Sequence, residues 1–327
     1  MIVAKTPLRV SYLGGGSDYQ EHIRDYESAF IGTTIDKFVY VAINKLEMFT
    51  EQAYRFTYRT TESVQSYSDF KHPVVKAALE HFKWDTHLNI STLADLPGGT
   101  GLGSSSSFTV SLIHALHEFN NTKVDPHTIA KLAILIEREK LQEVGGIQDQ
   151  VHAAFGGLKG YVFSQNNSEI FDFGTKMENI NYLSDRQWLV PLGESRSSAS
   201  ASQTVIDSSP DIVEYRKIIS SKAKEAIYKL QIAKSESEFY ATLVSAVNDS
   251  WNLKSQLIGM ASPEIKLQID SLKQAGADAV KLCGGGVSGF ALVLCEPTKI
   301  AAVARLFPPH WLINARSFHM GSSVIRL

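Results

Sequence analysis

Cysteine is scarce in this chain, and only Cys283 and Cys295 occur among 327 residues. One possible pair is not a disulfide framework, which excludes a disulfide-stapled mini-protein and favours a reducing compartment. The N-terminus lacks the basic start, unbroken apolar run and small-residue cleavage site of a signal peptide. No stretch approaches the roughly 18 apolar residues that a membrane span needs. We therefore expect a cytoplasmic protein without a membrane partner.

An excess of charge of either sign is also missing. Lys and Arg number 32, Asp and Glu number 34, and the formal net charge is −2. A chain without a basic field does not attract phosphate backbones, so nucleic acid is not an expected partner. Apolar residues make up 44% and charged residues 20%, which is typical of globular proteins and excludes a disordered chain. At roughly 150 residues per domain, the length suggests two domains or one large one.

Apolar residues with the periods of strands and helices predict a mixed α and β protein. In the first half, strands are expected over 2–13, 38–43 and 87–93, and helices over 73–82, over 104–119 and from Asp125 to near Gly145. A polar stretch over 164–187 places the boundary near Ser184, giving domains 1–184 and 185–327. In the second half, strands are expected over 188–192, 279–282, 290–294 and 310–318, and helices over 212–230, 238–257, 263–275 and 298–307.

The glycine- and serine-rich loop over 97–107 has the composition of a phosphate-binding loop. Glycines let backbone N–H groups approach an anion, the following helix start adds its dipole, and hydroxyls can reach a magnesium ion. The same residues also fit a glycine turn followed by a helix that serine caps, and this structure needs no ligand. The density of glycine and serine favours phosphate binding.

Three familiar motifs do not fit this loop. Ser104 follows Gly103 where a P-loop needs lysine, and the spacing also fails the dinucleotide-binding G-x-G-x-x-G pattern. The hydrolase elbow G-x-S-x-G is absent here and at 286–289. Any phosphate must be bound in another way.

Three motifs in order resemble those of the GHMP kinases, the family of galactokinase and of homoserine, mevalonate and phosphomevalonate kinases. They are TPLRV from Thr6 with Gly14 and Ser17-Asp18-Tyr19, the loop over 97–106, and KLCGGGVSGF over 281–290. The resemblance spans essentially the whole chain. It implies an α+β, two-domain GHMP kinase fold, with an N-terminal ATP-binding domain, a ferredoxin-like C-terminal domain and an active-site cleft between them.

Within that family the chain is most similar to the bacterial branch that phosphorylates heptose 7-phosphates. The similarity lies in TPLRVSYLGGGSD, in IERE over 136–139 followed by GGIQDQ over 145–150, in FGG over 155–157, and in ARSFH near the end. The Gln148-Asp149-Gln150 element is its most distinctive part.

The resemblance implies ATP and Mg²⁺ as cofactors. Magnesium would be held by Ser105 and Glu137, with Ser104 and Glu139 as adjacent candidates. The letters around Glu137 also fit the charged face of an ordinary helix. The residues expected to bind ATP are Pro97, Gly98, Gly99, Thr100, Gly101, Leu102, Gly103, Ser104, Ser105 and Ser106.

By the same resemblance, Asp149 is the catalytic aspartate and Arg9 is its cationic neighbour. Asp149 would orient the sugar hydroxyl, either as a true base or as an orienting group alone. Arg9 would favour the ionised carboxylate and stabilise charge on the transferred phosphoryl group. An aspartate after two glycines also fits a turn or a helix cap.

Asp18 would bind ring hydroxyls of a sugar. Gly15 and Gly16 stand where galactokinase has glutamate and histidine, so we expect a more open pocket that admits a longer, phosphorylated sugar. Arg196 and Lys281 are the candidates for binding that phosphate, although Arg196 also fits a surface loop. The residues expected to bind substrate are Gly15, Gly16, Ser17, Asp18, Arg196, Lys281, Gly284, Gly285 and Gly286.

The expected function is transfer of the γ-phosphoryl group of ATP to the anomeric hydroxyl of a heptose 7-phosphate, in the biosynthesis of nucleotide-activated heptose. One alternative is another sugar-1-kinase of the family, acting on fucose or an unphosphorylated heptose. Another is a non-catalytic regulator that binds ATP and sugar, against which the presence of Asp149, Arg9 and Glu137 argues. The expected partners are small molecules, and the sequence leaves the oligomeric state open.

Overall fold

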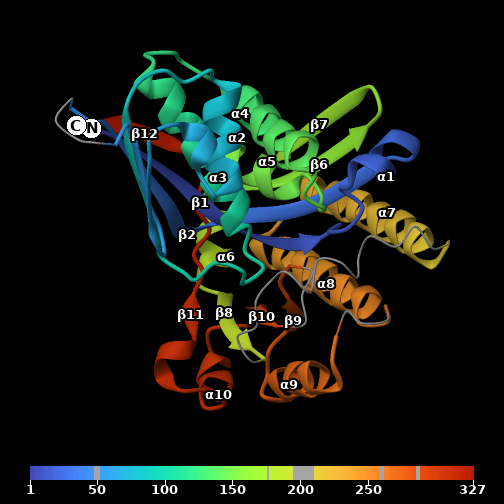
Figure 1. The fold of residues 1–327 in the computed structure, drawn as a ribbon. Helices are drawn as coiled ribbons and strands as arrows, with labels where there is room; N and C mark the ends of the chain where they lie inside the picture. Colours follow the sequence, from blue (N-terminus) through green and yellow to red (C-terminus); the bar gives the residue numbers. More distant parts are fainter. Residues whose placement is uncertain (48–51, 175–176, 194–209, 258–260, 285–287) are drawn as a thin grey trace.

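The computed structural model describes residues 1–47, 52–174, 177–193, 210–257, 261–284 and 288–327. Within these residues the chain forms one sheet of eight strands and one of four (Figure 1). The larger sheet lies between two layers of helices, and the smaller sheet lies beside it with two helices of its own. The expected α+β fold with two structural parts is confirmed.

The long strand β2 (Ser28–Lys45) organises the larger sheet. Along one side it pairs antiparallel with β1 (Ile2–Leu13). Along the other side it pairs first with β6 (Leu158–Ser164) and then with β5 (Leu88–Ala94). The remaining strands of this sheet are β3 (Tyr54–Thr57), β4 (Thr61–Val64), β7 (Asn167–Asp172) and β12 (Ser323–Arg326).

Helices cover both faces of this sheet. The four helices α2 (Pro73–His81), α3 (Ser104–Phe119), α4 (Pro126–Ile134) and α5 (Gln148–Phe155) lie on one face. On the other face lie α7 (Pro210–Ile232) and α8 (Glu236–Lys254). Short helices α1 (Gln20–Asp25) and α6 (Met177–Ser184) flank the sheet.

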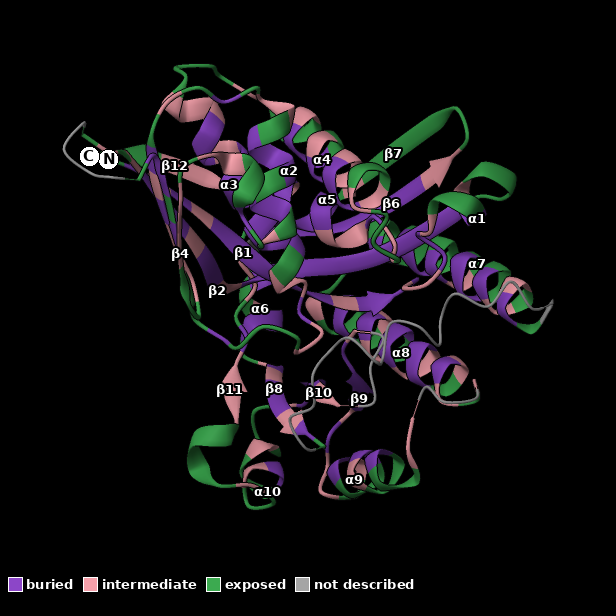
Figure 2. Cartoon of the chain, viewed as in Figure 1, coloured by how far each residue is buried: buried purple, intermediate pink, exposed green. Residues whose placement is uncertain are grey.

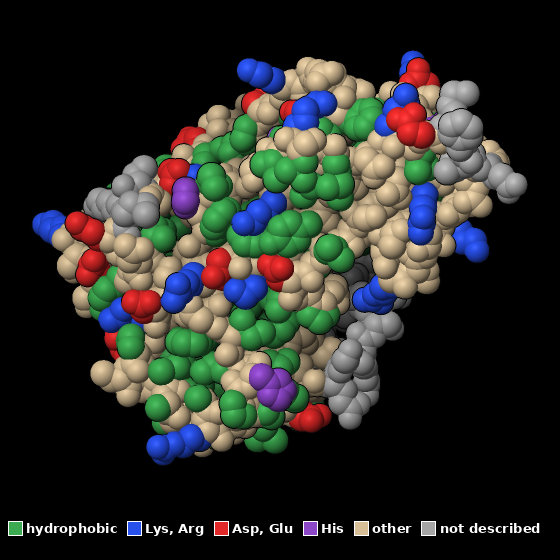
Figure 3. Space-filling view, turned by 90° about the vertical axis from the view of Figure 1, so that its left-hand side faces the viewer, with side chains coloured by type: hydrophobic (Ala, Val, Ile, Leu, Met, Phe, Trp, Pro, Cys, Tyr) green, Lys and Arg blue, Asp and Glu red, His purple; other side chains and the backbone are tan. Residues whose placement is uncertain are grey.

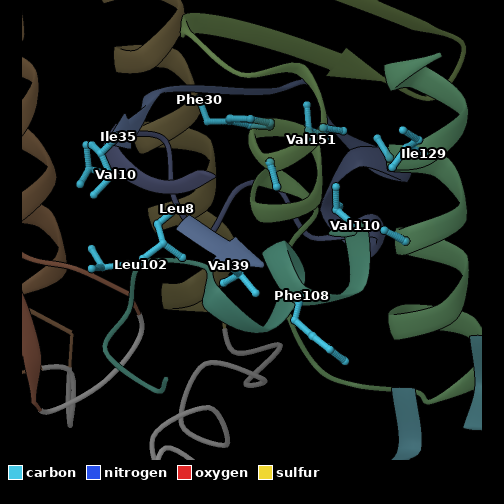
Figure 4. Packing of buried hydrophobic residues seen from close by; sticks show 14 of the residues in the cluster. Leu8, Val10, Phe30, Ile35, Val39, Leu102, Phe108, Val110, Ile129 and Val151 are labelled. Atoms are coloured by element: carbon cyan, nitrogen blue, oxygen red, sulfur yellow. The ribbon is translucent and has the colours of Figure 1, made fainter. Parts of the chain in front are cut away.

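Burial follows from this layering. The first eight residues of β2 are all buried rather than alternating, because a strand covered on both faces has no solvent side. Figure 2 shows β1 and β2 buried along most of their length. Leu8, Val110 and Val151, from β1, α3 and α5, belong to one apolar cluster (Figure 4). This cluster fixes the strand and the two helices that carry the site described below.

The smaller sheet has the order β11-β8-β10-β9, and all its pairings are antiparallel. Its core is a separate apolar cluster that includes Val190, Ile269 and Trp251. The elements of this part are β8 (Gln187–Leu192), α9 (Pro263–Gln274), β9 (Ala279–Leu282), β10 (Gly289–Leu294), α10 (Ile300–Ala304) and β11 (Ile313–Asn314).

The C-terminal end differs from the sequence expectation. The strand expected over 310–318 is a short 3-10 turn, Pro309–Trp311, followed by the two-residue β11. Proline lacks the N–H group that a strand ladder needs, so the ladder begins only after this turn. The unexpected strand β12 pairs with β1, which puts residues of the expected second domain, 185–327, into the first sheet. The exact domain boundary stays a prediction.

The surface carries charges of both signs. Figure 3 shows acidic and basic side chains interspersed over one face, in keeping with the small net charge. Within the described ranges, no helix combines the length and apolar character that a membrane span requires. Cys283 and Cys295 are both buried and unbonded to each other.

Candidate active site

Arg9 of β1 and Asp149 of α5 form an ion pair. The Arg9 Nε and Nη2 atoms both donate to Asp149 Oδ1, at 2.8 and 2.5 Å, while Nη1 donates to the carbonyl oxygen of Gly101 at 2.7 Å. Oδ2 of Asp149 accepts no hydrogen bond from the described residues. The Asp149 side chain is 25% exposed and that of Arg9 is 4% exposed. One carboxylate oxygen is therefore fixed and the other is available to a hydroxyl group.

The glycine loop before α3 passes directly over this ion pair. Gly101 and Gly103 have φ values of 81° and 74°, in the left-handed region that favours glycine. A β-carbon on Gly103 would lie 3.3 Å from Arg9 Cγ and 3.4 Å from Asp149 Oδ2. Gly103 also offers no side chain to cap α3, so the first N–H groups of that helix are free of a side-chain cap. Uncapped helix N–H groups fit an anionic ligand such as the phosphates of ATP.

The loop after β9 contacts the same glycine loop. Phe290 donates its backbone N–H to the carbonyl oxygen of Thr100 at 3.2 Å. A β-carbon on Gly101 would lie 2.5 Å from the carbonyl oxygen of Cys283, and one on Gly284 would lie 2.5 Å from the α-carbon of Gly101. The two expected glycine loops therefore meet where the two sheets adjoin.

Glu137 lies in a π-helical segment, Leu135–Lys140, and is 1% exposed. Its carboxylate accepts hydrogen bonds from Ser106 Oγ at 2.9 Å, from Thr109 Oγ1 at 2.5 Å and from Gln150 Nε2. Burial raises the pKa of Glu137, and the hydrogen bond from Thr109 opposes that rise. π-Helical turns frequently occur at functional sites.

The groups around Glu137 fit a magnesium ion. Mg²⁺ prefers oxygen ligands and is usually bound through one or two carboxylates together with phosphates and water. The amide oxygen of Gln150 is buried beside this carboxylate and has no hydrogen-bond partner. In the described part of the chain, no three His, Cys, Asp or Glu side chains gather as metal ligands. A metal here would therefore rest on a single carboxylate with neighbouring oxygens and the nucleotide.

The serine that donates a hydrogen bond to Glu137 is Ser106, whereas Ser105, which was expected to hold magnesium together with Glu137, is exposed. The assignment of Ser105 as a magnesium ligand stays a prediction. Consecutive residues of an α-helix point about 100° apart, so only one of two adjacent serines can face the carboxylate. Ser104, the other candidate, is half-buried at the start of α3.

Asp18 is 1% exposed and is held by the backbone around it. It accepts hydrogen bonds from the N–H groups of Gly16 and Gln148, both at 2.9 Å. A β-carbon on Gly146 would lie 1.8 Å from Asp18 Oδ2, so only glycine fits there. Burial raises the pKa of Asp18, and the two backbone hydrogen bonds lower it. Asp18 thus joins the first glycine loop to the start of α5.

The space beside Gly15 and Gly16 is partly occupied, which corrects the expectation of a simply opened pocket. A β-carbon on Gly15 would lie 3.3 Å from Gln148 Nε2, and one on Gly16 would lie 3.1 Å from the Tyr215 ring. Tyr215 also donates a hydrogen bond to the carbonyl oxygen of Gly15 at 3.1 Å. The glycines therefore allow side chains from α5 and α7 to approach the loop.

Three expected site residues lie in the interior. Ser17 Oγ donates to the Gly14 carbonyl oxygen at 2.8 Å, and the Leu102 side chain is fully buried in the larger core. Lys281 is buried, and its Nζ donates to Ser250 Oγ at 2.8 Å and to the carbonyl oxygen of Tyr12 at 3.4 Å. These side chains support the loops rather than facing an open site.

The remaining expected residues divide into two groups. Pro97, Gly98 and Gly99 are exposed, and Thr100 closes a turn by donating to the Pro97 carbonyl oxygen at 2.9 Å. Arg196, Gly285 and Gly286 lie outside the described residues.

Sequence reasoning assigned no role to the side chains of Thr109, Gln148 and Gln150. Thr109 lies three residues after Ser106, so both face the same side of α3. The helical period could therefore have predicted that Thr109 lies beside Ser106. The glutamines flank Asp149 in a motif that sequence analysis singled out, but their partners come from distant segments. Only the fold shows that Gln150 reaches Glu137.

Comparison with known proteins finds similarity to several kinases. Residues 70–157 match the family model for the GHMP kinases N terminal domain. The chain is 29% identical to a D-glycero-alpha-D-manno-heptose 7-phosphate kinase of Campylobacter jejuni, over 91% of this chain and 90% of that protein. It is 22% identical to a galactokinase of Pyrococcus furiosus, over 92% of this chain and 91% of that protein.

A solved structure with the same fold is a D-glycero-D-manno-heptose 1-phosphate kinase from Bacteroides thetaiotaomicron. The TM-score is 0.78 at 22% sequence identity, and the alignment covers 100% of this chain and 99% of that one. The two heptose kinases are named for substrates that carry the phosphate at different positions.

Proposed function

We propose that the chain is an ATP-dependent sugar kinase of the GHMP kinases and that its acceptor is a heptose phosphate. The preferred substrate is D-glycero-D-manno-heptose 7-phosphate, and the group phosphorylated is the anomeric hydroxyl. The product is the 1,7-bisphosphate, an intermediate suited to making nucleotide-activated heptose. The 29% identity with the Campylobacter enzyme over nine-tenths of both chains supports this choice.

The observation that carries the proposed phosphoryl transfer to a hydroxyl group is the one-sided pairing of Arg9 with Asp149. Both contacts from the guanidinium go to Oδ1, which leaves Oδ2 to accept a hydrogen bond from the attacking hydroxyl. The contact from Arg9 to the Gly101 carbonyl oxygen holds the phosphate loop in register with this carboxylate. Asp149 orients the nucleophile and takes its proton, and Arg9 faces the charge that develops during transfer.

The loop over 97–103 and the first turn of α3 would bind the phosphates of ATP through backbone N–H groups. Glu137 would hold Mg²⁺ together with Ser105, or with Ser106, which donates to Glu137, and the Gln150 amide oxygen lies nearby. When bound, the metal neutralises charge on the β- and γ-phosphates and fixes their geometry. The buried position of Glu137 keeps this carboxylate away from bulk water.

Asp18 and the loop over 14–17 would line the sugar side of the site, because Asp18 is joined to the residue preceding Asp149. Arg196 stays the proposed contact for the sugar's own phosphate. Lys281 is a weaker candidate than its sequence position suggested, because its ammonium group is bound by protein atoms.

The test is ADP release with Mg-ATP across a panel of acceptors. The panel holds mannose, fucose, mannoheptose, its 1-phosphate, its 7-phosphate and sedoheptulose 7-phosphate. Turnover on the 7-phosphate, with a new anomeric phosphate signal in phosphorus NMR, supports the proposal. Turnover on the 1-phosphate alone would move the transfer to another hydroxyl, turnover on fucose or mannoheptose alone would favour the other sugar-1-kinases, and no turnover would favour a regulator.

A further inference from the structure

Two buried polar atoms without partners lie beside Gly15. Ser11 Oγ and Gln148 Oε1 are both buried and make no hydrogen bond. A β-carbon built on Gly15 would lie 3.6 Å from the first and 4.0 Å from the second. The two oxygens therefore approach one small region over the glycine loop. Most buried polar atoms in proteins have a partner, so two orphans in one region call for an explanation.

The position of Gln148 is firmly set by its surroundings. Its backbone N–H donates to Asp18 Oδ2 at 2.9 Å, and the preceding N–H, of Ile147, donates to the carbonyl oxygen of Asp18 at 3.0 Å. The next residue is Asp149, whose carboxylate is fixed by Arg9. The backbone of Gln148 thus connects the carboxylate proposed to line the sugar side with the residue whose carboxylate is proposed to orient the nucleophile.

We propose that Gln148 and Ser11 form a subsite that binds one hydroxyl group of the acceptor sugar. A hydroxyl is both a donor and an acceptor. It can donate to Gln148 Oε1 and accept from Ser11 Oγ, which satisfies both orphan atoms at once. Gly15 places no β-carbon in this region, which the Gln148 amide nitrogen bounds at 3.3 Å from where a β-carbon would stand. This inference rests on the proposed function, since it assumes that the acceptor is a sugar.

Such a subsite determines specificity rather than rate. A site built to hydrogen-bond a hydroxyl discriminates strongly against an analogue that lacks it, because its buried polar groups are then left unpaired. Neither Gln148 nor Ser11 is the residue that accepts the proton of the nucleophile. Their loss should therefore raise KM for the sugar much more than it lowers kcat.

The experiment uses the variants Gln148→Met and Ser11→Ala with the sugar that the wild type turns over best. Gln148→Met keeps the length of the side chain and removes its polar atoms. We expect a rise in KM for the sugar of about tenfold or more for Gln148→Met, with KM for ATP within about twofold of the wild type. The matched control is Gln268→Met in α9, where another glutamine amide oxygen is buried without a partner, away from the site. It should leave KM for the sugar unchanged.

A third variant, Gly15→Ala, keeps both polar groups and fills the space between them. Its β-carbon would press on the Gln148 amide at 3.3 Å, and Gly15 does not need a positive φ. It should therefore fold and still raise KM for the sugar.

Monodeoxy analogues of the sugar give the second readout. One analogue should bind poorly to the wild type and show no further loss in Gln148→Met. An unchanged KM for the sugar in all three variants would overturn the subsite while leaving the kinase activity in place. Failure of the wild type to phosphorylate any sugar would refute the proposed function itself, and the subsite with it.

Discussion

Gln150 donates a hydrogen bond to the buried Glu137 from the position directly after Asp149 in α5. The carboxylate proposed to hold magnesium and the one proposed to orient the nucleophile are therefore linked through two adjacent residues of one helix. A shift of α5 would move Asp149 and would also change the hydrogen bond that Gln150 donates to Glu137. The spacing between metal and nucleophile thus depends on how α5 packs against the π-helical segment that carries Glu137.

Replacing Gln150 by leucine should weaken magnesium binding. Glu137 would lose its amide donor, and partners that orient a metal ligand typically account for a 10–100-fold difference in affinity. We expect the Mg²⁺ concentration at half-maximal rate to rise about tenfold, with much of kcat restored at high Mg²⁺. The measurement is a magnesium titration of the rate at saturating ATP, with Gln268→Leu as the matched control. An unaltered magnesium dependence would contradict the link between Gln150 and Glu137.

Asp149→Asn should abolish most of the turnover without unfolding the protein. Asparagine is nearly isosteric and can still accept a hydrogen bond from Arg9, but its amide cannot take the proton of the nucleophile. We expect kcat to fall by about 10²–10⁴-fold, with little change in KM for ATP. Steady-state kinetics and a thermal melt of the same preparation test this. A loss below about tenfold would mean that Asp149 only orients the hydroxyl.

Gly101→Ala should destabilise the protein, whereas Gly98→Ala in the same loop should not. Gly101 has a φ of 81°, and a β-carbon there would lie 2.5 Å from the carbonyl oxygen of Cys283. At Gly98 the nearest atom would be 3.8 Å away. We expect a loss of about 1–3 kcal/mol or more in the free energy of unfolding for Gly101→Ala. Denaturant titrations of the two variants make the comparison, and equal stabilities would show that the two loops do not touch.

The buried lysines predict a stability that rises with pH. Burial lowers the pKa of Lys281 to about 7 and that of Lys254 to about 8, below the roughly 10.4 of an unfolded lysine. Between the lowered pKa values of the folded protein and the higher pKa of an unfolded lysine, the unfolded chain binds more protons than the folded one. The free energy of unfolding therefore increases with pH in this range. This contribution is lost progressively as the pH falls from about 10.4, and the loss is complete once the pH is below the folded pKa values of about 8 for Lys254 and about 7 for Lys281.

Unfolding titrations from about pH 7 to about pH 9 should show this slope in the wild type. Lys281→Met should reduce this slope, because methionine has no ionisable proton, while Lys254 still contributes to it. The exposed Lys229 lies on α7 and offers the control Lys229→Met, which should keep the slope. Parallel curves for the wild type and Lys281→Met would show that Lys281 is ionised in the folded protein.

The sequence was enough to predict those parts of the site whose signal lies in neighbouring residues. The glycine loop and the start of α3 at Ser104 follow from glycines and hydroxyls before an apolar helix. Adjacent serines could not be told apart, because helix phase relative to Glu137 depends on how α3 packs against the π-helical segment. The pairing of Arg9 with Asp149 came from family resemblance, since residues so far apart in sequence meet only in the fold.

The remaining differences come from long-range contacts. Lys281 lies in a strand whose four residues are all buried. The strand therefore has no alternation of buried and exposed residues from which the direction of the Lys281 side chain could be predicted. β12 has four residues and no pattern that distinguishes it from a tail, and only its partner β1 makes it a strand. The proline-containing turn at 309–311 ended the strand expected there.

The pairing of β12 with β1 also affects how the protein is made. β1 carries Arg9 and β12 lies far along the chain from it, so that Ile2 pairs with Arg326. Translation proceeds at about 5–20 residues per second, so β1 is made many seconds before this edge partner. Until β12 has been synthesised, one edge of the larger sheet stays open, and a nascent chain that stalls before β12 would expose the backbone of the strand that positions Arg9.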